Sequence, residues 1–342
     1  MKQKWYHNFI GARTLKTGVA TFLTALFCLL LDLNPIFAIL TAVVTIEPTA
    51  KASLRKGYKR LPATVIGALV AVVATFFFGD DSALAYALSA TLTILLCTKL
   101  KLNAGTTVAT LTSVAMIPGI HDAYVFNFVS RLFTAIIGLI TAGLVNYLLF
   151  PPKYYNQLHE KIKESESHLY LLFDSRMKEL MIGLYKSKSS DKKLEKLLNL
   201  NTKIEQLIGY QRDELKYHKH QKSDWVNLRK ITNRAHENRM LMTHLSNIIY
   251  LPNDTVLHFT DEEKVAIIEI VEHVAEITTT ERFVPTPTAA TTLKNSVKGL
   301  EEFDNHQLKS HVIYEILLLY RILLQRYNPK TLSKESVGPH HD

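Results

Sequence analysis

Cysteine is scarce in this chain, with two residues in 342, and the common short motifs of enzymes are missing. Cys28 and Cys97 lie in separate apolar stretches, which excludes a disulfide framework and predicts two free, buried thiols. The sequence contains no glycine-rich phosphate loop, no Gly-x-Ser-x-Gly elbow and no His-Glu-x-x-His pair. We therefore predict that the protein is not an enzyme.

Metal ligands are also lacking at useful spacing, although the chain has 14 histidines. His218 and His220 are two positions apart in a lysine-rich stretch, and His340, His341 and Asp342 end the chain. Neither group has a cysteine or glutamate at the spacing of a structural or catalytic metal site. We expect no metal and no cofactor.

Charge is nearly absent from the first half of the chain. Only 13 Asp, Glu, Lys or Arg residues lie between Thr17 and Pro152, whereas 54 lie between Lys153 and Asp342. About 20 apolar residues in a helix cross the hydrocarbon core of a bilayer. The charge-free runs therefore predict six transmembrane spans. These runs are Thr17–Leu31, Leu33–Ile46, Leu61–Gly79, Ser82–Thr98, Leu102–Ile120 and Leu132–Pro152.

The basic residues between these runs predict the orientation. Twelve Lys and Arg residues fall on one side of the predicted membrane, and only Arg131 falls on the other. Because short cytoplasmic loops hold the Lys and Arg excess, we expect both termini to be cytoplasmic. No signal-peptidase site follows the first run, so we expect the N-terminus to be retained. The net charge of +9 arises mainly from these loops, and we predict no nucleic-acid binding.

The second half reads as amphipathic helices separated by loops. We place the loops at Lys186–Lys193, His218–Asp224, Pro252–Asp254 and Thr278–Ala290, and the end of the last helix near Tyr327. One predicted core stripe consists of Val265, Ile268, Val271 and Val274. No alternating strand pattern is present. The prediction is an all-α chain: a six-span transmembrane bundle over 1–152, an all-helical cytoplasmic domain over 153–329 and a disordered tail over 330–342.

Ionisable residues in or near the bilayer are functional candidates, because burying them in hydrocarbon is costly. Glu47 is the strongest, since it precedes a proline that interrupts the second run and faces a basic cluster starting at Lys51. It could carry a proton or hold a gate by pairing with Lys51, Arg55 or Arg60. The alternative is an interfacial cap on a cytoplasmic loop. Asp32 remains open between a site and a surface residue, and we expect Asp122 and Arg131 at the outer surface.

Several runs carry small residues at every fourth position, which favours close helix packing in lipid. They are Ala63, Gly67, Ala71 and Thr75; Ala85, Ser89, Thr93 and Cys97; and Gly105, Ala109 and Ser113. These stripes argue for a compact bundle and say nothing about a substrate.

One stretch, from Gly11 to Gly67, resembles the aromatic acid exporter family, within a wider group of fusaric-acid-resistance-type pumps and plant malate channels. The resemblance rests on Gly11-Ala12-Arg13-Thr14, Asn34-Pro35, Leu40–Thr49 and Gly57–Gly67. In the last segment Gly57, Arg60, Thr64 and Gly67 match the Gly-x-x-Arg-x-x-Gly-Thr-x-x-Gly pattern, and Ala63 replaces a glycine. The closer match is a branch from Gram-positive bacteria that adds a helical cytoplasmic domain after a junction like Val145–Pro152.

The resemblance implies a transporter in the bacterial plasma membrane that exports small aromatic or other organic carboxylates, driven by protons. Under this hypothesis Lys51, Arg55 and Arg60 attract the carboxylate, Glu47 couples the proton, and Asn34-Pro35 shapes the outer hairpin. The candidate transport or gating residues are Asp32, Asn34, Pro35, Glu47, Lys51, Arg55, Arg60 and Thr64, with Gly57 and Gly67 for helix packing. A passive organic-anion channel and a membrane-anchored interaction or sensing protein remain alternatives. Six spans are few to enclose a pathway, so we expect a homo-oligomer.

Overall fold

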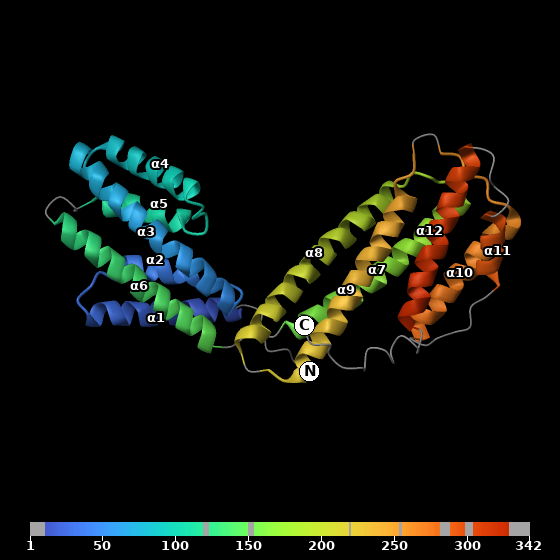
Figure 1. The fold of residues 1–342 in the computed structure, drawn as a ribbon, viewed down its shortest axis with the longest axis horizontal. Coiled ribbons are helices and arrows are strands. Elements are labelled where there is room, and N and C mark those ends of the chain that lie inside the picture. Colours follow the sequence, from blue (N-terminus) through green and yellow to red (C-terminus); the bar gives the residue numbers. More distant parts are fainter. Residues whose placement is uncertain are drawn as a thin grey trace. The chain divides into compact units, whose positions relative to one another are not determined.

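The computed structural model describes residues 11–118, 123–149, 154–218, 220–252, 255–280, 288–297 and 304–327. Within these residues the chain forms twelve α-helices and no strand, which confirms the all-α class (Figure 1). The chain divides into two compact units. Unit 1 comprises Met1–Lys153 and Tyr210–Gln221, and unit 2 comprises Tyr154–Gly209 and Lys222–Asp342.

Unit 1 contains the apolar helices. They are α1 (Ala12–Leu30), α2 (Ile36–Thr45), α3 (Ala50–Phe78), α4 (Ala83–Lys99), α5 (Thr106–Met116) and α6 (Tyr124–Leu148). Three of them, α1, α3 and α6, are long and apolar enough to cross a membrane, whereas α2, α4 and α5 are shorter apolar helices of 10–17 residues. The chain is an integral membrane protein, and the number of six spans stays a prediction.

Small residues set the distances between helices in unit 1. A Cβ atom added to Gly67 of α3 would lie 2.3 Å from the carbonyl oxygen of Ala109 on α5. A Cβ added to Gly138 of α6 would lie 2.3 Å from the carbonyl oxygen of Ala38 on α2. Both approaches require glycine, because any side chain would push the backbones apart. Helix α3 also contacts α4 and α6, and α1 contacts α2 and α6 (Figure 1).

Large apolar side chains cover much of the outside of unit 1. Phe22, Leu30, Phe76, Phe77 and Phe126 are each at least two-thirds exposed. An apolar exterior of this kind suits hydrocarbon surroundings and would be unstable in water. The interior is instead built from alanine, glycine, serine and threonine, which allows the helices to approach closely.

Two expectations for the charged residues of unit 1 are wrong. The basic segment from Lys51 to Arg60 is not a loop but the first turns of α3, which begins at Ala50. Thr49 caps this helix, because its Oγ1 atom accepts a hydrogen bond from the N–H of Ala52 at 3.1 Å. The helix therefore begins about three turns before the apolar run that starts at Leu61. Arg131 does not lie at the surface but inside α6, where it is 4% exposed. Asp122 lies outside the described residues.

Unit 2 is formed by long amphipathic helices. They are α7 (Tyr155–Met181), α8 (Lys188–Tyr217) as far as Gly209, α9 (Lys222–Ile249), α10 (Asp261–Thr280), α11 (Ala289–Val297) and α12 (Asp304–Tyr327). The last residues of α8, from Tyr210, belong to unit 1. Apolar side chains of α7, α9, α10 and α12 form one continuous core. The predicted tail from 330 and the Pro151-Pro152 junction lie outside the described residues.

Two details of unit 2 differ from the sequence-based expectation. Helix α8 begins at Lys188, inside the predicted loop Lys186–Lys193. On α10, Val265 and Ile268 are exposed and Val271 is half-buried, whereas Val274 is buried as predicted. The other buried apolar positions include Ala266, Ile267 and Ile270. The helix is apolar over more than one face, so periodicity alone left its rotation ambiguous by about one residue.

Candidate functional site

The break between α2 and α3 lies inside unit 1 and is held by side chains. Helix α2 ends at Thr45 and α3 begins at Ala50, so the backbone groups between them lack helical partners. The hydroxyl of Ser53 donates to the carbonyl oxygen of Thr45 at 2.7 Å and accepts from the N–H of Glu47 at 3.2 Å. Irregular backbone is stable at membrane depth only when it is satisfied in this way.

Asn146 of α6 completes the same network from the opposite side. Its side-chain amide nitrogen lies within hydrogen-bond distance of the carbonyl oxygens of Glu47 (3.1 Å) and Thr49 (3.3 Å) and of the Ser53 hydroxyl (2.7 Å). Its side-chain oxygen accepts a hydrogen bond from Nζ of Lys16 at 2.9 Å. Asn146 is 1% exposed, so these direct contacts join α1, the α2–α3 break and α6 in the interior of unit 1.

The carboxylate of Glu47 is held between two cations of α3. Its Oε1 accepts from Nη2 of Arg60 and its Oε2 from Nζ of Lys56, each at 2.8 Å. Burial opposes ionisation of Glu47, but the hydrogen bonds and charges of Lys56 and Arg60 outweigh it and lower its pKa. Glu47 is therefore a carboxylate at neutral pH in this arrangement. We call Lys16, Glu47, Ser53, Lys56, Arg60 and Asn146 the Glu47 cluster.

Arg60 is buried, whereas an arginine at a membrane interface extends its charged end into water. It is 5% exposed, and its Nε donates to the carbonyl oxygen of Ala104 at 3.2 Å in the α4–α5 connection. Its Nη1 has no hydrogen-bond partner among the residues that the structure describes. The guanidinium therefore binds the Glu47 carboxylate through Nη2, while Nη1, a nitrogen with two N–H donors, is left without a partner among these residues.

The end of α8 supplies a carboxylate to the start of α3. Oε1 of Glu214 accepts a hydrogen bond from the N–H of Ala50 at 3.1 Å, and the neighbouring Asp213 pairs with Lys51 at 2.7 Å. A negative charge at a helix N-terminus is favourable. Burial nevertheless dominates and raises the pKa of Glu214, against the Ala50 N–H and the charges of His218 and Lys16, which favour its ionised form.

The predicted site residues fall into two groups. Glu47 and Arg60 meet directly, and Thr64 is buried one turn after Arg60 on α3. Asp32 and Asn34 lie instead in the turn between α1 and α2, ten residues of helix away from Glu47. Both are exposed, and the side chain of Asn34 accepts from the N–H of Ile36 at 3.1 Å, just after Pro35. The structure therefore does not bring this hairpin together with Glu47.

Two predicted partners of Glu47 do not reach it. Lys51 pairs with Asp213, and Arg55 is exposed with no ion pair among the described residues. Lys56, which the sequence analysis did not select, takes their place because it lies one turn before Arg60 on the same helix. The predicted packing glycines lie against neighbouring helices, Gly57 near Leu139 and Gly67 at Ala109.

Several members of the site were missed from the sequence. Ser53, Asn146 and Lys16 have no local motif, and their meeting depends on contacts across as many as 130 positions. Glu214 lies in a stretch rich in Lys and Glu, where a carboxylate is usually solvated. The one available signal was Asn146 itself, an amide inside an otherwise apolar run, since a buried amide must find several partners.

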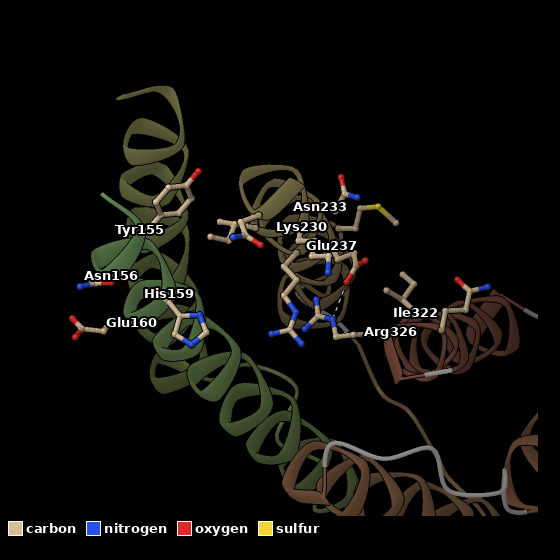
Figure 2. A pocket seen from close by; sticks show the side chains of 14 residues that line it. Tyr155, Asn156, His159, Glu160, Lys230, Asn233, Glu237, Ile322 and Arg326 are labelled. Carbon is tan, nitrogen blue, oxygen red and sulfur yellow. Dashed lines mark hydrogen bonds and ion pairs between the residues drawn. The ribbon is translucent and has the colours of Figure 1, made fainter. Parts of the chain in front are cut away.

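Unit 2 contains a separate cavity of about 1050 Å³ between α7, α9 and α12 (Figure 2). Figure 2 shows His159 of α7 on one side of it and Arg326 of α12 beside Glu237 on the other. The Nε of Arg326 donates to Glu237 at 2.8 Å, whereas Lys230 has no ion pair among the described residues. The cavity has the size and mixed polarity of a small-molecule site.

The histidines do not form a metal site in the part of the chain that the structure describes. No group of three or more His, Cys, Asp or Glu side chains there is arranged to hold a metal ion. His218 instead stacks on the ring of Tyr147, with ring centres 4.9 Å apart. His340 and His341 lie outside the described residues.

Comparison with known proteins gives two kinds of similarity. Residues 8–149 match the family described as aromatic acid exporter family member 1. Over 327 residues the chain is 62% identical to UPF0421 protein SSP0904 of Staphylococcus saprophyticus, which covers 96% of this chain and all of that protein. It is 63% identical to UPF0421 protein SH1063 of Staphylococcus haemolyticus and 56% identical to UPF0421 protein SAUSA300_1870 of Staphylococcus aureus, each across 96% of this chain. These alignments cover 99% and 100% of the two relatives, so the similarity includes both units.

Proposed function

Because the chain belongs to the aromatic acid exporter family, we propose that it exports small organic carboxylates, aromatic ones among them, across the bacterial plasma membrane. Both termini and the Glu47 cluster face the cytoplasm in this proposal, as the Lys and Arg distribution favours. The substrate is then an anion that enters from the side on which Arg60 lies.

One observation carries the proposal: a buried guanidinium inside the exporter domain is held by a carboxylate of the protein itself. Arg60 is 5% exposed and pairs with Glu47 at 2.8 Å, yet keeps an unused donor on Nη1. A carboxylate substrate presents the same chemical group as Glu47. It can therefore take the place of Glu47 on Arg60 without leaving the buried charge unpaired.

This exchange has a consequence for the driving force. When the substrate occupies Arg60, Glu47 stays buried but loses one of the two cations that lower its pKa, so it binds a proton more readily. The proton and the anion then bind at the same time. An exporter driven by inward protons instead needs the proton and the anion to compete, so that one binds only when the other has left. Coupling to inward protons is therefore disfavoured, whereas an anion that leaves without a proton, while Glu47 stays paired with Lys56, moves outward along the membrane potential. That potential contributes about 2.3 kcal/mol per charge for each 100 mV.

The experiment is release of 4-hydroxybenzoate from proteoliposomes, with protein-free liposomes as the leak control. We expect saturable release under an inside-negative potassium diffusion potential and little additional release from a pH gradient alone. Release that requires the pH gradient and is lost in Glu47→Gln would instead support the proton-coupled exporter. A current that does not saturate would support a passive channel.

Variants of the Glu47–Arg60 pair test the exchange. Glu47→Gln removes the competing carboxylate, so the KM for 4-hydroxybenzoate should fall. Arg60→Gln should slow release by at least about tenfold, the usual weight of a hydrogen bond to a charged group. Lys59→Gln, an exposed neighbour on the same helix, is the matched control. Equal KM values in the wild type, Glu47→Gln and Arg60→Gln proteins would contradict the exchange.

A second candidate function, ligand sensing, is favoured by the cavity of unit 2 (Figure 2). Lys230 and Arg326 give it cationic groups and Met240 and Ile322 apolar ones, a combination that suits an amphipathic anion. Hydrogen exchange of the full chain in nanodiscs tests it. Protection of α9 by 4-hydroxybenzoate that disappears in Lys230→Gln, with transport unchanged, would favour sensing.

A further inference from the structure

Arg131 is a lone cation in the interior of unit 1. It lies on α6 and is 4% exposed. Its Nη2 donates to the hydroxyl of Thr112 on α5 at 2.5 Å, and its guanidinium carbon lies 3.8 Å from the ring centre of Phe37 on α2. Three helices, α2, α5 and α6, therefore meet around this single charge.

Most of the donors of this guanidinium are unused. Its Nε and Nη1 have no hydrogen-bond partner among the described residues, and no carboxylate in that part of the chain pairs with it. Arginine has five N–H donors, and the Thr112 hydroxyl accepts from only one of its nitrogens. A buried, uncompensated charge is among the most destabilising features that a helical bundle can contain. Its presence requires a purpose other than stability.

The surroundings of Arg131 define what would complete it. The missing partner is an anion with at least two acceptor atoms, because a guanidinium binds a carboxylate through paired, charge-assisted hydrogen bonds. Phe37 already covers the guanidinium, which shows that an aromatic ring is accommodated beside the charge. A carboxylate attached to an aromatic or apolar body matches both features.

We infer that Arg131 binds the carboxylate of the transported acid within the bundle, with Thr112 and Phe37 positioning the guanidinium. This inference rests on the proposed function. It differs from the role of Arg60, which lies on α3 and has Glu47 as its own partner, whereas Arg131 has no carboxylate partner among the described residues. Because Arg131 is covered by protein, a substrate reaches it only when the helices around it separate, as alternating access requires.

The test combines stability with binding in the purified full chain. Arg131→Met removes the charge and keeps a long side chain, so its Tm should equal or exceed that of the wild type if the cation exists for binding. 4-Hydroxybenzoate should raise the Tm of the wild type but not that of Arg131→Met, and affinity should fall about 10- to 100-fold. Arg131→Lys keeps the charge without the fork, and should bind more weakly than the wild type.

The outcomes separate this inference from the proposed function. Transport by the wild type with the same affinity in Arg131→Met and Arg131→Lys would overturn the role of Arg131 and leave an exporter. A wild type that transports nothing, yet shows a Tm shift that depends on Arg131, would overturn export and support the site. If 4-hydroxybenzoate produces no Tm shift in the wild type, the inference fails. A large fall in Tm in Arg131→Met with unchanged affinity would assign the residue a structural role.

Discussion

Asn146 and Glu47 are 99 positions apart, and the side-chain amide of Asn146 donates to the backbone carbonyl of Glu47 at 3.1 Å. The contact fixes the loop from which the Glu47 carboxylate reaches Arg60. It is made by the backbone of Glu47, so it persists whether or not the carboxylate is paired. The loop can therefore stay in place while the carboxylate exchanges its partner.

The first prediction concerns this amide. Asn146→Leu removes the hydrogen bond to the carbonyl oxygen of Glu47, and it leaves Nζ of Lys16 only the backbone oxygen of residue 146 and the carbonyl of Thr49 only the N–H of Ser53. Unpaired buried polar groups cost about 1–3 kcal/mol each. We expect a fall in Tm of roughly 5–15 °C. Thermal unfolding in detergent measures it, with Thr91→Ala as control, since that exposed hydroxyl bonds only within its own helix. A Tm within 1–2 °C (about the precision expected of such scans) would show that the network contributes little.

The second prediction concerns the contact of α3 with α5. Gly67→Ala places a Cβ atom 2.3 Å from the carbonyl oxygen of Ala109, and backbone cannot move aside as a flexible side chain can. The helices must separate, at a cost of about 1–3 kcal/mol. Gly143→Ala is the matched control, because a Cβ there meets nothing within 4 Å. The control should fold as the wild type does, and equal stability of the two variants would argue against the close approach.

The third prediction is a pH dependence from Glu214. Burial raises its pKa above the ordinary value of 4.5 in the folded protein. Between 4.5 and the raised value the folded chain holds more proton at this site than the unfolded chain, so stability falls as the pH rises through that window. Glu214→Gln removes this contribution, so its Tm should fall less than that of the wild type as the pH rises from 4.5 through that window.

His218 must be controlled in that experiment. Its Nδ1 lies 3.0 Å from Oε2 of Glu214, so it contacts the same carboxyl group. Comparing the wild type with Glu214→Gln again in a His218→Asn background isolates the carboxyl group. Parallel Tm curves for the proteins with and without the Glu214→Gln substitution, in both backgrounds, would mean that Glu214 is ionised throughout the window.

The sequence predicted the helices of both units better than it predicted the site. Charge-free runs identify apolar helices, because lipid excludes charge. A run stops at the nearest charged residue, however, whereas the helix can continue beyond that residue. Helix α3 therefore starts three turns before its run, and Arg131 falls inside α6. Glu47 was recognisable because a proline follows it. Asn146 and Glu214 were not, because their importance arises from contacts between distant segments that no local pattern records.

The last prediction concerns the most buried charge of unit 2. Arg176 is 0% exposed, and its guanidinium donates to the carbonyl oxygens of Ile248, Leu184 and Tyr185. These carbonyls follow or end α7 and α9, where helical partners run out. Lysine keeps the charge, but its compact ammonium group cannot donate hydrogen bonds to all three of these carbonyl oxygens, which the wider planar guanidinium does.

Arg176→Lys should therefore lower the stability of unit 2 by about 2–4 kcal/mol, since it leaves buried carbonyls unpaired. The control is Arg239→Lys, whose side chain is 64% exposed and pairs with Glu205 at the surface. Hydrogen exchange of the full chain, read on α7 and α9, distinguishes a local loss from global unfolding. If Arg176→Lys and Arg239→Lys exchange at the same rate there, the carbonyls are satisfied by another route and the role assigned to Arg176 is wrong.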